Sequence, residues 1–121
     1  TDVCVPISRL AECVEETRKD IEECGILSSI VGHVGDGNFH CLPMCDPEDK
    51  EMRAVIDGFI SRLSERAIAM GGTCTGEHGI GQGKQNYIRK EHGDAVDVMM
   101  MIKNTLDPKG IMNPGKIFPQ N

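Results

Sequence analysis

The fold of this chain is decided by residues 26–43, which read ILSSIVGHVGDGNFHCLP. Two apolar, strand-like runs flank Asp36-Gly37 in this stretch. An Asp-Gly pair between such runs is the strongest local signal for a hairpin closed by a two-residue type I′ turn. The sequence therefore predicts an antiparallel hairpin in which His33 faces His40 directly.

This register divides the side chains of the hairpin between two faces, because neighbouring residues of a strand point to opposite sides. The face expected to lie in the core carries Ile30, Val34, Phe39 and Cys41. The other face carries Val31, His33, Gly35, Asn38, His40 and Leu42. Directly opposed imidazoles have Cβ atoms roughly 5 Å apart and could bind one ion. Two exposed histidines that face each other by accident of strand pairing would give the same pattern.

The segments around the hairpin predict further strands and helices. Apolar residues recur at spacings of three and four in both long helical segments. We expect Ser8 to cap the first helix and Asp46-Pro47 to begin the second. The expected elements are a strand at 2–7, a helix from 8 to 24, strands at 26–34 and 38–43, a helix from 46 to 70, a short strand at 73–75, and helices near 84–91 and 94–106.

The order β-α-β-β-α-β predicts an α+β domain. It is the order of a ferredoxin-like unit, in which helices cover one face of an antiparallel sheet. C-terminal helices and an irregular tail after Asp107-Pro108 complete the expected architecture. We expect residues 1–121 to be one domain, a fragment of a longer polypeptide because Thr1 resembles mid-domain sequence.

Composition excludes several classes of partner. The chain has 13 Lys+Arg against 19 Asp+Glu and a formal charge of −6, with no basic block that would bind phosphates, so we expect no nucleic-acid partner. No apolar run approaches the roughly 18 residues of a membrane span, and no signal segment is visible. The six cysteines form no C-x-x-C pair. We expect reduced thiols, mostly in the core; a thiol-redox or iron–sulfur protein is the alternative use.

A second cluster of functional side chains lies in residues 76–81, which read GEHGIG. The glycines free Glu77 and His78 from strict alternation, so both side chains could reach one site. Two histidines and a carboxylate are a common ligand set for catalytic zinc and non-haem iron. A P-loop is excluded by spacing, because His78 occupies a required glycine position and Gln85 the Ser/Thr position. His92 is expected to lie solvated at a helix end.

Three strings in order resemble the C-terminal domain of FAD-linked 2-hydroxyacid oxidases and dehydrogenases. They are GHVGDGNFH at 32–40, GEHGIG at 76–81 and LDPKGIMNPGK at 106–116. The resemblance implies that His33, His40 and Glu77 are metal ligands and His78 the catalytic base, although the residues alone would allow Glu77 and His78 to exchange roles. By the register, Asn38 shares the ligand face and is expected to contact the substrate or the flavin; a turn-capping asparagine is the alternative. The resemblance also implies flavin contacts for Asn113 and Lys116, which would otherwise be interpreted as part of a C-terminal turn.

The activity implied by this resemblance is that of a flavoprotein oxidoreductase. It would oxidise D-lactate or a related anionic D-2-hydroxyacid to the 2-oxoacid. FAD would be bound mainly by an N-terminal domain that these residues lack, so the chain would be inactive alone. The resemblance also implies a divalent metal (zinc, manganese or iron), an electron acceptor such as cytochrome c or a flavoprotein, and a mitochondrial location. The alternative is a non-catalytic metal-binding module of ferredoxin-like fold.

Overall fold

The computed structural model describes residues 1–119, which divide into two compact units, Thr1–Glu77 and the residues from His78 onward. The first unit contains β1 (Asp2–Cys4), α1 (Ile7–Cys24), β2 (Leu27–Val31), the 3-10 turn η1 (Val34–Asp36), β3 (Asn38–Met44) and α2 (Lys50–Ala69). The second contains α3 (Gln85–His92) and α4 (Ala95–Leu106), within a residue of the helices predicted. None of the helices in the described part is long and apolar enough to cross a membrane.

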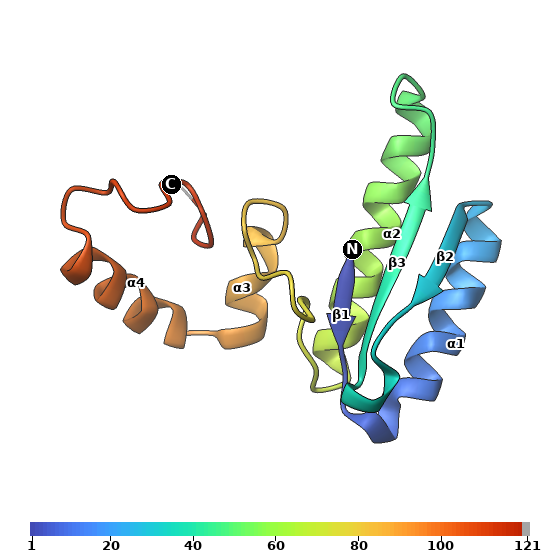
Figure 1. The fold of residues 1–121 in the computed structure, drawn as a ribbon, viewed down its shortest axis with the longest axis horizontal. Helices are drawn as coiled ribbons and strands as arrows, with labels where there is room; N and C mark the ends of the chain where they lie inside the picture. The colour runs from blue at the N-terminus through green and yellow to red at the C-terminus, as the bar shows by residue number, and fades with distance from the viewer. Residues whose placement is uncertain (120–121) are drawn as a thin grey trace. The chain divides into compact units, whose positions relative to one another are not determined.

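The first unit is an antiparallel sheet with strand order β1-β3-β2. Helices α1 and α2 both lie on one face of it (Figure 1). The expected fourth strand is reduced to a single bridge on the free edge of β1, where Thr73 donates its N–H to the Cys4 carbonyl at 2.8 Å. This is the place of the fourth strand in a ferredoxin-like unit, so the predicted α+β class is confirmed.

The core fills the space between the sheet and its two helices. Phe39 and Cys41 lie in it as predicted, and Phe59 and Leu63 of α2 are fully buried against them. All six cysteines are free thiols. Three of them are buried as expected, whereas Cys45 is exposed. Cys13 and Cys41 are buried because they lie on the core-facing sides of α1 and β3. Cys45 is exposed because it lies just beyond the end of β3.

The hairpin register differs from the predicted one by two residues. His40 pairs with Val31 and not with His33. A type I′ turn needs positive φ at both central residues, but only Gly37 has it, at 76°. The connection is instead a longer loop containing η1, in which Asp36 donates its N–H to the His33 carbonyl at 2.9 Å.

Gly37 gives the physical reason for this longer loop. Its carbonyl accepts the N–H of Val5 at 3.0 Å, and a Cβ at this position would lie 2.1 Å from the Val5 carbonyl oxygen. The loop therefore packs against the end of β1, a contact that local sequence does not encode. Val34 is 62% exposed in the turn, so its predicted place in the core was wrong.

Both long helices begin at a different residue from the one predicted. Helix α1 starts at Ile7 after Pro6, which places Ser8 inside its first turn. Helix α2 is capped by Asp49, whose Oδ1 accepts the N–H of Met52 at 2.9 Å. Asp46 forms a turn of its own, because its side chain accepts the N–H of Glu48.

Helices α1 and α2 are joined by ion pairs around the buried carboxylate of Asp20. Arg62 Nη2 lies 2.7 Å from Asp20 Oδ1, and Arg66 Nη2 lies 3.1 Å from Asp20 Oδ2. Burial by itself raises the pKa of Asp20, but the hydrogen bonds from the two guanidinium groups outweigh it, and the pKa is lowered overall. The ionised carboxylate thus stabilises the helical layer.

Candidate metal centre

The centre of the candidate site is a contact between His40 and Glu77. His40 lies on β3, on the sheet face opposite the buried side chains of Phe39 and Cys41. Its Nε2 atom lies 2.9 Å from Oε1 of Glu77, in the segment that follows α2. The His40 side chain is 14% exposed and that of Glu77 is 49% exposed. The fold therefore brings together two of the three residues that the sequence suggested as ligands.

His33 lies beside this pair, although it is not the cross-strand partner of His40. The two imidazole rings meet edge to face, with centroids 6.5 Å apart. His33 is exposed and directly precedes η1, so its position depends on the loop and not on strand pairing. Glu77 and His33 thus both lie next to His40.

Asp2 is a member of this site that sequence reasoning missed. It is the cross-strand neighbour of His40 in the ladder between β1 and β3, and it is 1% exposed. Its Oδ2 atom accepts the backbone N–H of Glu77 at 2.7 Å. One carboxylate oxygen lies within 4.8 Å of a ring nitrogen of His40. The available signal was alternation, since Val3 points into the core and Asp2 must therefore share the face of His40.

Asn38 lies on the same face as His40, two residues earlier in β3. Its amide is 7% exposed, and its Oδ1 atom has no hydrogen-bond partner among residues 1–119. Gly76 lies against it, because a Cβ on Gly76 would be 2.0 Å from that oxygen. Asn38 shares the face of His40 as expected, whereas His33 lies in the loop, and the Asn38 side chain borders the segment that carries Glu77.

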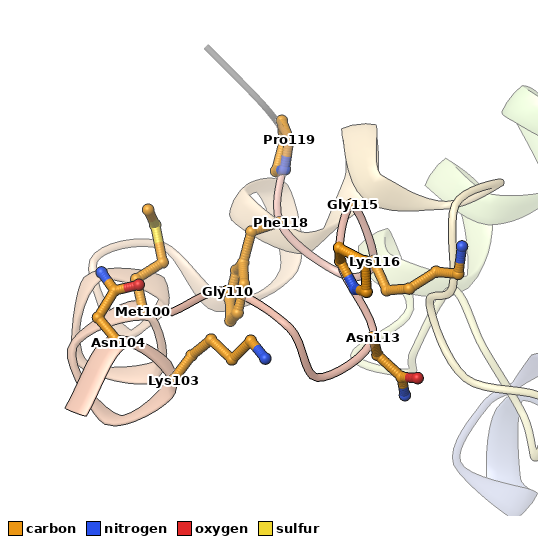
Figure 2. Close-up of a pocket in the computed structure, with 10 residues that line it drawn as sticks. Met100, Lys103, Asn104, Gly110, Asn113, Gly115, Lys116, Phe118 and Pro119 are labelled. Atoms are coloured by element: carbon orange, nitrogen blue, oxygen red, sulfur yellow. The ribbon is translucent and has the colours of Figure 1, made fainter. Parts of the chain in front are cut away.

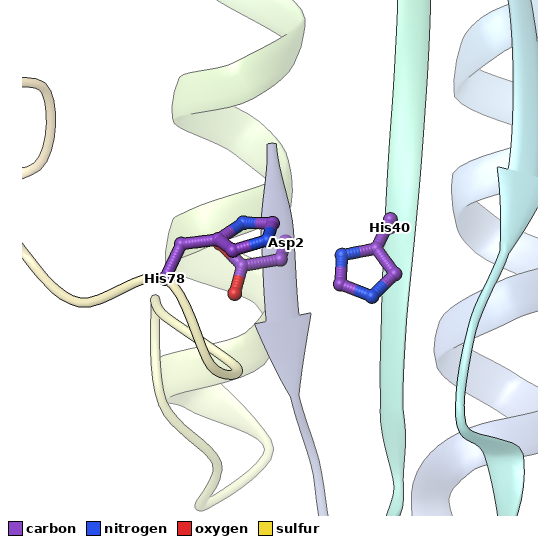
Figure 3. A group of neighbouring side chains, drawn as sticks. All are labelled: Asp2, His40 and His78. Atoms are coloured by element: carbon purple, nitrogen blue, oxygen red, sulfur yellow. The ribbon is translucent and has the colours of Figure 1, made fainter.

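His78 follows Glu77 by one peptide bond and is the first residue of the second unit. Its side chain is exposed. Figure 3 draws it together with Asp2 on β1 and His40 on β3. A neutral imidazole at this position has one nitrogen able to accept a proton.

The tail of the second unit holds the remaining predicted residues, Asn113 and Lys116. Both line an opening of about 230 Å³ that is also bordered by Met100 and Phe118 (Figure 2). Asn113 has a φ of 45°, in the left-handed region that non-glycine residues rarely adopt. Gln85 of α3 donates to the carbonyl of Gly115 at 2.9 Å. The tail therefore has a defined conformation supported from α3.

The base of the tail is held by Asp107. Its carboxylate accepts the N–H groups of Ile111 and Met112, each at 2.9 Å, and pairs with Lys103 at 2.6 Å. The hydrogen bond from Lys103 is the largest influence on the Asp107 carboxyl and lowers its pKa. These bonds order the chain between α4 and Asn113.

The donors around His40 and Glu77 fit a divalent metal ion. Imidazole nitrogen and carboxylate oxygen are the donors that zinc, manganese and non-haem iron accept in proteins. The separation of 2.9 Å between Nε2 and Oε1 is close to that between neighbouring ligands of an ion bound at about 2.0–2.2 Å. His33, His40 and Glu77 are the ligands that the resemblance implies, and a carboxylate oxygen of Asp2 also lies within 4.8 Å of a ring nitrogen of His40. A set of three protein ligands would leave positions for substrate.

The fold and the candidate site can now be compared with known protein families. The model of the family "FAD linked oxidases, C-terminal domain" matches residues 1–117. The chain therefore belongs to this family.

Individual relatives are similar over nearly the whole chain. It is 53% identical to the probable mitochondrial D-lactate dehydrogenase of Danio rerio over 119 residues, which is 98% of this chain and 24% of that protein. It is 47% identical to the mitochondrial D-lactate dehydrogenase [cytochrome] of Arabidopsis thaliana, over 98% of this chain and 21% of the relative. Glycolate oxidase subunit GlcD of Bacillus subtilis is 35% identical, over 99% of this chain and 26% of the relative. The chain thus spans about a quarter of the length of these relatives or less.

Proposed function

We propose that this chain is the metal- and substrate-binding part of an FAD-dependent dehydrogenase that oxidises D-lactate or a related D-2-hydroxyacid to the 2-oxoacid. The observation that carries the proposal is the contact of His40 with Glu77, with the ring of His33 alongside, in a chain of the FAD-linked oxidase family. The names of the Danio and Arabidopsis relatives support D-lactate as the substrate.

In this proposal His33, His40 and Glu77 hold a divalent metal, which can be zinc, manganese or iron. A bound metal would supply a local positive charge for the carboxylate and hydroxyl groups of the substrate and would favour loss of the hydroxyl proton. Such a cation is needed because the chain carries a net charge of −6 and would otherwise repel an anionic substrate. By holding the metal, His33, His40 and Glu77 thus create a position that binds an anionic substrate on an acidic chain.

His78 acts as the base in this proposal. Its imidazole accepts the hydroxyl proton of the substrate on a ring nitrogen, a task that imidazole performs near neutral pH. FAD bound by another part of the protein would supply the hydride acceptor. Because His78 directly follows Glu77 in the sequence, the base is adjacent to a proposed metal ligand. The assignment of Glu77 as ligand and His78 as base rests on family resemblance.

Asn38, Asn113 and Lys116 have binding roles in this proposal. The unpaired Oδ1 of Asn38 supports a hydrogen bond with the substrate or the flavin, because a buried acceptor without a partner is costly. Asn113 and Lys116 contact the flavin in this proposal, and the support for this role is that both line the same opening in the tail.

The cellular setting of the proposed enzyme follows from its relatives. A mitochondrial location is supported by the names of the Danio and Arabidopsis proteins. The bracketed word in "D-lactate dehydrogenase [cytochrome]" supports a cytochrome, such as cytochrome c, as the electron acceptor; another flavoprotein is the other candidate.

A chimaera tests the proposed function. This chain would replace the matching 119 residues of the Danio rerio relative, which would supply the flavin-binding part. We expect anaerobic D-lactate, but not L-lactate, to bleach the flavin absorbance of the chimaera. A chimaera that binds FAD and metal but is not reduced by any D-2-hydroxyacid would contradict the proposal and favour the non-catalytic metal-binding module.

A further inference from the structure

Asp2 is a carboxylate buried at the candidate metal centre. It is 1% exposed, in the first strand of the sheet, and it faces His40 across the ladder. Placing a carboxylate out of water costs several kcal/mol unless it gains strong hydrogen bonds or a nearby positive charge. A serine or valine at this buried strand position would lose less solvation free energy, so the presence of a carboxylate needs an explanation.

The first part of the explanation is the hydrogen bond from the backbone N–H of Glu77 to Asp2 Oδ2. It is 2.7 Å long and joins residues 75 positions apart. Bonds to an ionised acceptor are short and roughly twice as strong as neutral ones. This bond fixes the backbone of Glu77 where its side chain reaches Nε2 of His40.

The second part is the close packing of the segment that Asp2 holds. A Cβ on Gly76 would lie 2.0 Å from Asn38 Oδ1 and 3.0 Å from Asp2 Oδ2. The residue before Glu77 therefore touches the side chains of both neighbouring strands, and only glycine allows this approach. The position of Glu77 is thus determined from β1 and β3 together.

The third part is the distance between Asp2 and the imidazole of His40. One carboxylate oxygen lies within 4.8 Å of a ring nitrogen. At this distance the carboxylate acts on His40 through its charge. Where a carboxylate supports a ligating histidine, its loss commonly weakens metal binding 10–100-fold. Asp2 is thus placed to act on two ligands at once, on Glu77 through its backbone and on His40 through its charge.

We propose that Asp2 is a positioning residue of the metal centre, which sets the backbone of Glu77 and adds negative charge beside His40. The inference rests on the proposed function, because it presupposes a divalent metal at His33, His40 and Glu77.

Metal titration of the 121-residue chain by calorimetry, with Zn²⁺ and separately Mn²⁺, tests this inference. Asp2→Asn preserves the shape and one acceptor oxygen but removes the charge, and we expect the metal affinity to fall about tenfold. Asp2→Ala also removes the acceptor, and the loss should approach a hundredfold. The matched control is Asp57→Asn, the same change at an exposed residue of α2, which should bind as the wild type does.

Two further measurements separate positioning from a general structural effect. The visible absorption bands of bound Co²⁺ should change in Asp2→Asn while its far-ultraviolet circular dichroism stays that of the wild type. In the wild-type chain the Glu77 amide should exchange its hydrogen slowly. Rapid exchange of that amide would overturn the inference even if both Asp2 variants failed to fold.

The outcomes distinguish this inference from the proposed function. Asp2→Asn with wild-type affinity and an unchanged Co²⁺ spectrum, alongside a Glu77→Ala variant that loses metal, would overturn the role of Asp2 and leave the proposed metal centre intact. A wild-type chain that binds neither Zn²⁺ nor Mn²⁺, or a His40→Ala variant that binds them as well as the wild type, would overturn the metal centre itself.

Discussion

The Nε2 atom of His40 lies 2.9 Å from Oε1 of Glu77, joining the central strand of the sheet to the segment that follows α2. Because both atoms are metal donors, an ion bound between them would link two distant parts of the first unit. Ligands that bind only the folded state stabilise it, by about 2.7 kcal/mol at a hundredfold excess over Kd.

We therefore predict that Zn²⁺ or Mn²⁺ raises the melting temperature of the chain and that a chelator reverses the effect. Differential scanning calorimetry measures it. The His40→Ala variant should show no shift, because it lacks the central ligand. A wild-type melting temperature that is insensitive to both ions would argue against the metal centre.

The roles of His78 and His33 can be separated in the chimaera. We predict that His78→Ala keeps its metal content but is not reduced by D-lactate, because it loses only the proton acceptor. His33→Ala should lose both metal and reduction. Elemental analysis and flavin absorbance measure the two properties. His92→Ala, at the end of α3, is the control and should change neither; flavin reduction at the wild-type rate in His78→Ala would refute the base assignment.

Gly76 allows a close approach between the Glu77 segment and the sheet. We predict that Gly76→Ala destabilises the chain by about 1–3 kcal/mol, because the added Cβ would lie 2.0 Å from Asn38 Oδ1. Urea unfolding measures the loss. Gly35→Ala is the matched control, since a Cβ there meets no atom within 4 Å, and it should stay within about 0.5 kcal/mol of the wild type. Equal stability of the two variants would mean that the segment moves away without cost.

Asp20 should make stability depend on acidic pH. Its pKa is lowered in the folded state, so its contribution is fully present above the ordinary aspartate pKa of about 3.9 and is lost as pH falls through that value and the lower folded one. Asp20→Asn should be less stable than the wild type at neutral pH by on the order of 1–3 kcal/mol.

The two unfolding free energies should converge as the pH falls below about 4. Urea unfolding across the acidic range measures this convergence. The exposed Asp57→Asn variant should follow the wild type throughout. A difference between wild type and Asp20→Asn that stayed constant with pH would show that the effect of Asp20 is not due to its charge.

Local pattern was sufficient for most of the helices and strands and for the sheet face on which His40 lies. Apolar spacing of three and four predicted α1 and α2, since each helix buries one stripe, with Phe59 and Leu63 at the centre of the second. Alternation correctly placed Phe39 and Cys41 in the core and His40 on the opposite face. The helix starts at Ser8 and Asp46 were wrong by one to four residues, because several residues near each start can form a cap or turn.

Residue types and short-range periodicity were enough to establish the α+β order, the family and the side chains available for a metal. How these elements and side chains come together depends on contacts between distant parts of the chain. The hairpin register shifted by two residues because Gly37 packs on Val5, a contact between separate elements. Asp2 joined the site because its carboxylate accepts the N–H of Glu77, 75 residues away. Such contacts depend on how the strands and helices pack together, and no local pattern records them.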